Sequence, residues 1–425
     1  MQPSTLRVRN YRSYPLTQEV QLRPLTLFYG ENSAGKSALV RLLPLLADSM
    51  GTEDSAPLDL SGPAARRNTY ADLRWKGVPE DEEDAPVEMS IELEWRDAPE
   101  LARAEFVFDM EPTWKRLIIK RFAFLSATGA LLLRGVWRFR SEEQSSPALT
   151  YALELGDERL EVPVRFRGLI PDAPEGRTEP IWAMLRTRLL ALRRSLLWLS
   201  SRTVTDRFQP RPVGPVWTMK SDGGDFGAVL ASQPEVLEEV SSWFRKNLKR
   251  ALEVQDLPSS LFGLHLRHTA RAELDVDVLD SGEGVLKVLP VLTALALCRS
   301  PSSAAPRILA IEEPESNLHP VLQRALAEHI GTILSQDGAL PCLLLETHSQ
   351  HLLLGVQIQV AKGLLRPEQV QVYWVHQDEE GRSMADPIHI DETGRLQGNW
   401  PPDVYTEIND MSAELLLARR GRARP

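Results

Sequence analysis

Two patterns of hydrophobic and polar residues alternate along the chain and predict where its strands and helices lie. Residues 25–30, LTLFYG, form a short apolar run that ends in glycine, and residues 36–50 repeat apolar residues at helical spacing. The first pattern predicts a strand and the second an amphipathic helix. The start of the chain is therefore expected to form a strand, a glycine-rich loop and a helix.

The middle of the chain predicts a different architecture. Residues 79–86, PEDEEDAP, are an acidic run typical of a solvated loop. The strand-like runs that follow are residues 87–95, 106–110, 116–125, 130–139 and 148–155. Because turns separate these runs, they predict an antiparallel sheet. Residues 181–199 and 236–254 then predict two helices, the first with arginines between Leu and Trp residues.

From Leu264 onward, strand and helix patterns alternate again. The runs are residues 274–280, 284–298, 307–314, 319–334, 341–349 and 370–377. This alternation predicts a mainly parallel sheet covered by helices. The expected fold class is therefore α/β with a large α+β insertion: an N-terminal lobe over 1–80, an inserted β-rich and helical module over 81–260, and a C-terminal lobe over 261–425.

Composition and charge exclude only a few classes of protein. The net charge of −10 argues against a uniformly basic coat for nucleic acid, although a local basic groove stays compatible with it. Cys298 and Cys342 lie in apolar runs without metal-ligand spacing, which favours buried thiols in a reducing cytoplasm. No N-terminal run resembles a secretion signal, and no apolar run approaches the roughly 20 residues that span a bilayer. A cytoplasmic protein is expected.

The glycine-rich loop carries the clearest chemical signal. Residues 30–37, GENSAGKS, match G-x-x-x-x-G-K-[ST], and the strand before and helix after them are the required context. In such a loop, backbone N–H groups surround the phosphates, Lys36 neutralises the β and γ oxygens, and the Ser37 hydroxyl contacts Mg²⁺. The candidate nucleotide-contacting residues of the loop are Gly30, Glu31, Asn32, Ser33, Ala34, Gly35, Lys36, Ser37 and Ala38.

Two later strands end in polar residues that complete this chemistry. The run RILAIEEP delivers Glu312 and Glu313, and the run LLLETHS delivers His348. We assign Glu312 to Mg²⁺ and Glu313 to the attacking water, since a carboxylate in that position can prepare in-line attack on a γ-phosphate. His348 is expected to contact and sense the γ-phosphate. ATP and Mg²⁺ are the expected cofactors.

A second glycine-containing loop, DSGEG, precedes the helical run 284–298. Ser281, Gly282 and Gly284 would lie at a helix N-terminus, where backbone N–H groups favour an anion. Because the first loop already holds the chain's own nucleotide, this second loop is expected to serve the nucleotide of a partner subunit. A simple turn is the alternative interpretation.

Together these four elements, in this order, resemble the SMC/ABC-type ATPase heads. The start RNYRSY is similar to the N-F-[RK]-S element that opens RecF, SMC and OLD (overcoming-lysogenization-defect) proteins, and it makes Arg12 a further candidate nucleotide-binding residue. A closer resemblance is to the stand-alone bacterial AAA-type ATPases related to OLD nucleases, several of which serve anti-phage defence. The segments that carry it are 58–73, 214–230, 284–292, 312–320 and 399–408, with little similarity between about Pro79 and Leu190.

The resemblance implies an ATPase head, a P-loop fold with a mixed sheet flanked by helices, that dimerises around two ATP molecules. Each signature loop would contact the γ-phosphate held by the other subunit. A separate effector protein, nuclease or toxin-like, would respond to the nucleotide state. The implied roles are Walker A for the 30–37 loop, Walker B for Glu312 and Glu313, switch histidine for His348, and signature for Ser281, Gly282 and Gly284. Glu312 replaces the Asp of transporters, and no Q-loop glutamine can be identified; Asp72 lies in the right region but equally suits a surface turn.

Two other functions stay open at this point. A RecF-like repair ATPase or the ATPase half of a nuclease would act on nucleic acid directly, and the arginines of residues 186–202 could contact phosphates or pack against the protein. The 77 residues after His348 (425 minus 348) are too few for the TOPRIM nuclease domain of OLD proteins. The nucleotide-binding subunit of a membrane transporter shares the motif order, but the insertion and the EEPESNLHP variant speak against it.

Overall fold

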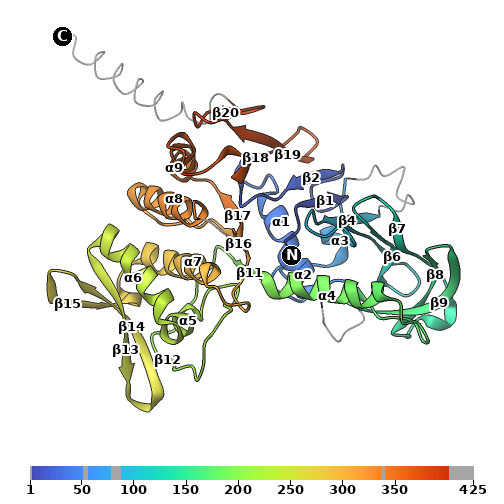
Figure 1. Cartoon of the computed structure of the whole chain (residues 1–425), viewed down its shortest axis with the longest axis horizontal. Coiled ribbons are helices and arrows are strands. Elements are labelled where there is room, and N and C mark those ends of the chain that lie inside the picture. Colours follow the sequence, from blue (N-terminus) through green and yellow to red (C-terminus); the bar gives the residue numbers. More distant parts are fainter. Residues whose placement is uncertain (1, 51–55, 78–87, 337–339, 402–425) are drawn as a thin grey trace, which may run out of the picture.

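The computed structural model describes residues 2–50, 56–77, 88–336 and 340–401, which form three sheets side by side (Figure 1). The largest sheet lies on one side of the molecule, the smallest on the other, and the seven-stranded sheet lies between them. The acidic run 79–86 and residues 402–408 of the C-terminal similarity segment lie outside the described residues.

The central seven-stranded sheet carries the predicted strand–loop–helix unit. Its order is β11-β16-β17-β3-β18-β19-β20, with β11 through β18 parallel and β19 and β20 antiparallel. The bounds are β11 Leu196–Leu199, β16 Ile308–Glu312, β17 Cys342–Thr347, β3 Leu25–Gly30, β18 Val370–Gln377, β19 Ser383–Ile390 and β20 Leu396–Gln397. The prediction of a mainly parallel sheet is therefore confirmed.

Helices cover both faces of this sheet, and its strands are apolar on both sides. Along β16, Ile308 and Ala310 belong to one hydrophobic cluster, and Leu309 and Ile311 to the other. A strand buried on both faces reads as a continuous apolar run, as ILAI does. The helices on the first face are α1 Lys36–Val40 and α2 Leu42–Ser49; those on the second are α7 Glu283–Arg299, α8 Pro320–Leu334 and α9 Gln350–Ala361.

The nine-stranded sheet is antiparallel throughout, as the middle of the sequence predicts. Its order is β10-β9-β8-β7-β6-β5-β4-β1-β2. The bounds are β1 Thr5–Arg9, β2 Gln18–Gln21, β4 Met89–Glu94, β5 Arg103–Glu111, β6 Arg116–Leu125, β7 Leu131–Trp137, β8 Ala148–Leu155, β9 Glu158–Arg167 and β10 Ile170–Pro171; the short helix α3 is Tyr70–Leu73. Because β1 pairs with β4, strands from both sides of the expected boundary at residue 80 share one sheet.

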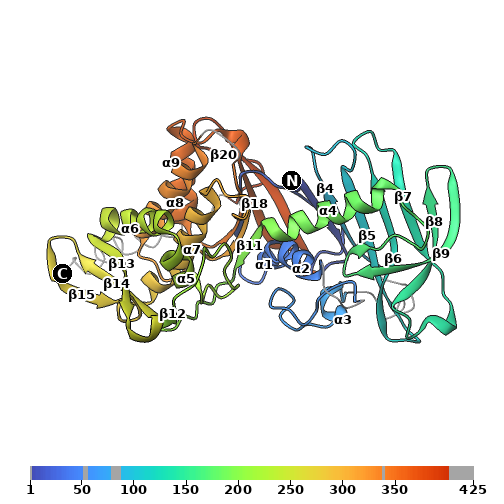
Figure 2. The same ribbon diagram turned by 60° about the horizontal axis from the view of Figure 1, so that its bottom comes forward.

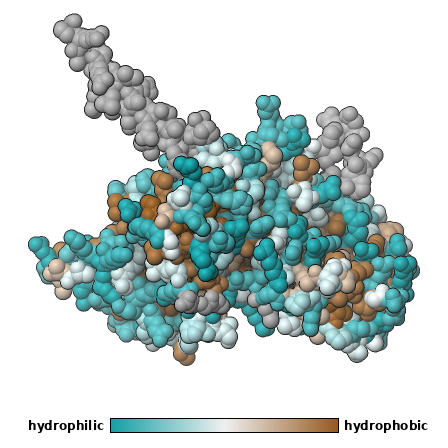
Figure 3. Space-filling view, turned by 45° about the horizontal axis from the view of Figure 1, so that its top comes forward, coloured by the Kyte–Doolittle hydropathy of each residue, from teal (hydrophilic) through white to brown (hydrophobic). Residues whose placement is uncertain are grey.

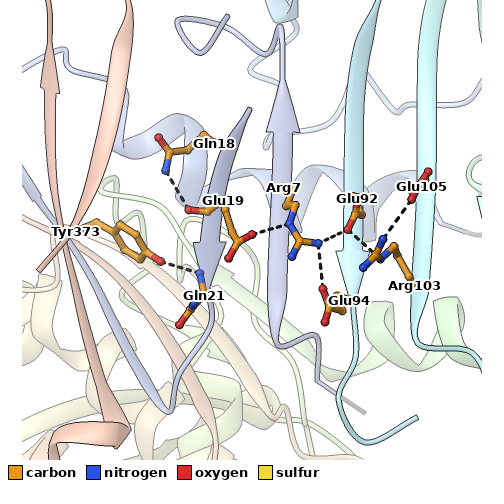
Figure 4. Close-up of polar contacts among 9 residues, drawn as sticks. All are labelled: Arg7, Gln18, Glu19, Gln21, Glu92, Glu94, Arg103, Glu105 and Tyr373. Atoms are coloured by element: carbon orange, nitrogen blue, oxygen red, sulfur yellow. Dashed lines mark hydrogen bonds and ion pairs between the residues drawn. The ribbon is translucent and has the colours of Figure 1, made fainter. Parts of the chain in front are cut away.

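A row of polar contacts crosses the edge of this sheet and reaches the central one (Figure 4). Arg7 on β1 donates to Glu19 Oε2 at 2.7 Å and to Glu94 Oε2 at 3.0 Å. At the end of the row, the Tyr373 hydroxyl on β18 accepts a hydrogen bond from the backbone N–H of Gln21 at 2.7 Å. Since β18 pairs with β3, this contact holds the antiparallel sheet against the strand that leads into the glycine-rich loop.

The third sheet and its helices form the remaining part of the fold. The strands β12 Gln209–Pro210, β13 Arg250–Leu257, β14 Leu261–His268 and β15 Arg271–Asp277 accompany the helices α5 Phe226–Ser232 and α6 Pro234–Leu248. The helix predicted over 236–254 is wrong after Leu248, because Lys249 adopts a left-handed conformation (φ 56°) that ends the helix, and the chain continues into β13. Residues 81–260 are thus divided among all three sheets.

The predicted basic helix is shorter than expected and is packed against the protein. Helix α4, Pro180–Ser195, runs across the nine-stranded sheet (Figure 2), and residues 196–199 form β11 instead of a last helical turn. The Arg188 guanidinium lies 5.6 Å from the Trp95 ring centroid, and Arg186 lies 4.0 Å from Asp172. These contacts support packing of those two arginines rather than phosphate binding.

None of the helices in the described ranges has both the length and the apolar composition needed to cross a bilayer. Figure 3 shows a mostly hydrophilic face with separate hydrophobic patches.

Candidate functional site

The functional residues predicted from the sequence gather at one edge of the central sheet. The strands β3, β16, β17 and β11 are parallel, so their carboxyl ends meet at this edge. The register places Glu312 opposite Glu346 and Thr347 opposite Tyr29. Crevices at the carboxyl ends of parallel strands are the usual ligand sites of α/β folds.

The glycines of the loop between β3 and α1 are required by close backbone packing. Gly30 has φ 152°, and a Cβ atom there would lie 2.0 Å from the carbonyl oxygen of Val375. Gly35 has φ 102°, and a Cβ there would lie about 3 Å from the hydroxyls of Ser13 and Tyr14. The Tyr14 hydroxyl also donates to the carbonyl of Gly35 at 3.2 Å. The N-terminal segment RNYRSY therefore packs against Gly35 of the loop.

Lys36 is buried inside this loop. Its Nζ donates to the carbonyl oxygen of Gly30 at 3.1 Å and to that of Glu31. Burial lowers the pKa of the ammonium group, while the negative charges of Glu346, Glu313 and Glu31 act in the opposite direction. The lysine thus occupies the loop interior as a cation held by backbone carbonyls, which anionic phosphates can replace.

An open pocket of about 390 Å³ lies in front of the loop. Arg12, Ser33, Gly35, Ser37 and Ala38 are among its lining residues, whereas Glu31 and Asn32 are solvent-exposed and Ala34 is buried. The Arg12 Nε atom is buried and has no hydrogen-bond partner among the described residues. A buried donor of this kind fits an anionic ligand in the pocket. Arg12, which the sequence predicts to bind nucleotide, therefore lines the same pocket as the loop residues.

Glu346 is the carboxylate next to Ser37, and the sequence analysis did not identify it. The Ser37 hydroxyl donates to Glu346 Oε1 at 2.7 Å, and Glu346 Oε2 is buried without a partner among the described residues. Burial raises the pKa of this carboxyl to about 7. A buried carboxylate oxygen beside a serine hydroxyl matches the hard oxygen ligands that Mg²⁺ prefers. The only available signal was the acidic residue in ETHS, at the end of a buried strand.

Glu312, which the sequence assigns to Mg²⁺, makes other contacts in the structure. Both of its carboxylate oxygens accept hydrogen bonds from the Arg41 guanidinium, and Oε1 also accepts one from Trp198 Nε1 at 3.2 Å. All three side chains are buried. A buried, fully hydrogen-bonded ion pair of this kind is costly to open. The metal role of Glu312 stays a prediction, and the carboxylate adjacent to Ser37 is that of Glu346.

Glu313 and His348 lie together, as the sequence predicts, and Glu346 joins them. One ligand atom from each of the three side chains lies within 4.8 Å of the other two. Glu313 has φ 45°, an uncommon backbone conformation for a residue with a side chain, and such strain is concentrated at functional sites. Burial, and secondarily the Lys36 charge, lowers the pKa of His348. The cluster can bind a cation or position a water molecule.

Glu315 is a second carboxylate that the sequence analysis missed, and it positions the histidine segment. It is 6% exposed, and its Oε1 accepts hydrogen bonds from Thr347 Oγ1 at 2.7 Å and from the backbone N–H of His348 at 3.0 Å. Burial raises the pKa of Glu315. The loop after β16 therefore holds the end of β17 through this side chain.

The second glycine loop lies at the start of α7, as predicted. Gly282 has φ 99°, and a Cβ atom there would meet no atom within 4 Å. At Gly284, a Cβ atom would lie 2.6 Å from the carbonyl oxygen of Asn317. The Asn317 amide also donates to Glu283 at 2.8 Å. Gly282 therefore presents an open surface, whereas Gly284 packs against the loop that follows Glu313. Ser281 is half-buried, and its hydroxyl donates to the Val278 carbonyl.

The end of β11 contributes a further element that the sequence analysis missed. Ser200 and Ser201 line a small cavity together with Glu312 and Glu313. Asp72, considered above as a Q-loop ligand, lines the pocket in front of the glycine-rich loop together with Ser37. Its carboxylate also caps the start of α3 through Thr69 and pairs with Lys76 at 2.8 Å. Thr203, Asp222 and Lys287 line the same small cavity as the two serines and the paired glutamates.

One family model matches part of the chain. A family model described as "AAA domain, putative AbiEii toxin, Type IV TA system" matches residues 220–354, which contain the second glycine loop, both glutamates and His348. No curated protein matches the sequence.

Solved structures of SMC heads resemble the whole fold. An SMC head bound to the C-terminal winged-helix domain of ScpA has a TM-score of 0.50 and 10% identity, covering 92% of this chain and 99% of that one. The SMC head domain from Thermotoga maritima gives 0.41 and 11%, covering 91% and 99%. A third SMC head, with an extended coiled coil and bound to the C-terminal domain of ScpA derived from Pyrococcus furiosus, gives 0.46 and 10%, covering 98% and 99%. The fold assignment rests on the first of these structures: the chain has the P-loop fold of an ABC/SMC-type head.

Proposed function

We propose that this protein binds and hydrolyses ATP between two copies of itself and acts as a nucleotide-controlled switch for a separate effector protein. The observation that carries the proposal is the cluster of Glu313, Glu346 and His348 beside the loop that holds Lys36 and Ser37. A loop that binds phosphates and a nearby base for water are the two parts that phosphoanhydride hydrolysis needs.

The roles of the residues follow from their positions. Lys36 would exchange its backbone carbonyl partners for the β and γ oxygens of ATP, and Arg12 would contact phosphate from the pocket side. Ser37 and Glu346 would hold Mg²⁺, which when bound neutralises charge on the transferred phosphoryl group. Glu313 would accept a proton from the attacking water, and His348 would donate to the γ-phosphate.

The geometry of the second glycine loop supports a role across the dimer. Gly282 has open space around it at the N-terminus of a 17-residue helix, next to the half-buried Ser281. Lys287 Nζ joins this helix to Ser316 Oγ at 3.2 Å. A movement of the Glu313 loop would therefore be transmitted to the second glycine loop. Because ATP and ADP differ in their contacts with such a loop, hydrolysis can shift the equilibrium between closed and open dimers. A cytoplasmic role in defence against phage is the proposed setting.

Gly282→Arg tests the contact between subunits. We expect ATP hydrolysis to fall at least about tenfold, because an arginine on the open loop would obstruct the approach of the second subunit's triphosphate. Gly156→Arg is the matched control, since Gly156 also has positive φ and open space around its Cβ but lies in the turn between β8 and β9. Steady-state ATPase rates measure both. Equal rates for the two variants would remove the loop from the reaction.

A further inference from the structure

A second basic pocket adjoins the one in front of the nucleotide loop, with which it shares Arg41 and Arg66, and it is not used by the proposed hydrolysis. Its volume is about 590 Å³, within the usual range of small-molecule sites, and its walls include Arg67, Arg202 and Ser221. The loop residues Lys36 and Ser37 do not line it. Arg41, whose guanidinium binds Glu312, lines both this pocket and the one in front of the loop.

The charged residues that line this pocket are all positive among those described. Four arginines and four serines line it, and no carboxylate is among its described lining residues. Neither Arg67 nor Arg202 forms an ion pair with any other residue that the structure describes, although most of the arginines on the neighbouring nine-stranded sheet are paired with acids. Unpaired guanidinium groups facing hydroxyl donors are the usual recognition elements for phosphate.

The backbone that presents these arginines is held in an uncommon conformation. Arg66 and Arg67 both have φ 56°, a backbone conformation that is unfavourable for residues with a side chain. Asp59 fixes the turn before them, because its Oδ1 accepts hydrogen bonds from the backbone N–H of Ser61 and of Gly62 at 3.0 and 3.1 Å. The opposite wall is fixed as well, since the backbone N–H of Ser200 donates to the Ser221 carbonyl at 2.7 Å.

We propose that this pocket is a second anion site, which binds a small phosphate-bearing ligand of mononucleotide or pyrophosphate size independently of ATP in the glycine-rich loop. The volume is too small for a duplex, and the arginine and serine donors match phosphate oxygens. An anion in this pocket lies beside Arg41 and therefore next to the partner of Glu312.

The test uses full-length Lys36→Ala protein, which lacks the lysine of the ATP site and retains every residue that lines the second pocket. Isothermal titration at physiological salt with pyrophosphate, with ADP and with a 12-nucleotide single strand separates the possible sources of phosphate. We expect pyrophosphate or ADP to bind, and the affinity to fall at least about tenfold in Lys36→Ala protein that also carries Arg67→Gln and Arg202→Gln, because each replacement removes charge-assisted hydrogen bonds. Tighter binding of ADP than of pyrophosphate would identify a nucleotide site, and the reverse an inorganic phosphate site.

The control is Arg138→Gln in the same background, since Arg138 is exposed on the nine-stranded sheet, away from this pocket. Three results would overturn the proposal: no binding of either small ligand to Lys36→Ala protein, binding that persists unchanged without Arg67 and Arg202, or binding of the single strand alone. ATP binding by the unaltered protein tests the proposed ATPase separately, so each proposal can fail without the other.

Discussion

The Lys36→Ala variant should lose ATP binding at the glycine-rich loop, where the affinity should be at least about 100-fold weaker than in the parent protein. Several charge-assisted contacts to phosphate at this site depend on this one ammonium group. In the structure this group is buried and is enclosed by the carbonyls of Gly30 and Glu31. Equilibrium binding of a fluorescent ATP analogue measures the effect.

Lys362→Ala is the control for this experiment. Lys362 is exposed at the end of α9, and its removal also subtracts one positive charge. We expect the control to bind ATP like the parent. Thermal unfolding of both variants should give similar midpoints, which separates loss of binding from loss of folding. An affinity of the Lys36→Ala protein within threefold of the parent's would contradict the assignment of this loop.

The Glu313→Gln variant should bind ATP normally and hydrolyse it about 100- to 10,000-fold more slowly, since a positioned general base contributes factors of this size. Glutamine keeps the size and the hydrogen-bonding geometry of the side chain but cannot accept the proton of the attacking water. Single-turnover hydrolysis and ATP binding, measured on the same preparation, separate the two steps.

Glu368→Gln, on the exposed turn before β18, controls for the loss of one negative charge. Glu346→Gln is expected to weaken metal binding instead. Because Glu346 accepts the Ser37 hydrogen bond, its replacement should raise the Mg²⁺ concentration needed for half-maximal activity. Parental turnover by the Glu313→Gln protein would show that another group serves as the base, and the Glu346 and His348 variants would then be tested for that role.

Much of the site can be predicted from the sequence because it depends on local patterns. The glycine-rich loop lies between a buried strand and a helix, and Glu313 and His348 each follow the end of a parallel strand, so the sequence predicts their common edge. The structure brings these two residues together with Glu346.

The remaining features depend on which strands are neighbours. Glu346 faces Ser37 only because β17 lies between β16 and β3, an order that the residue pattern does not contain. In the same way, Arg41 binds Glu312 across 271 residues of sequence. Residues 196–199 continue the helical spacing of α4, but pairing with β16 makes them a strand, since Leu197, Trp198 and Leu199 are buried between layers. Tertiary packing overrides local preference in this segment.

We propose that one copy's nucleotide loop and the other copy's second glycine loop make one active site. Mixing Lys36→Ala protein with Ser281→Arg protein tests it directly, because each is defective alone but a mixed dimer contains one site with both parental elements. For randomly mixed symmetric dimers, the account predicts low ATPase activity for each variant alone and about a quarter of the parental rate per subunit after mixing. Parental activity of the Ser281→Arg protein alone, or no recovery in a mixture shown to form heterodimers, would contradict it.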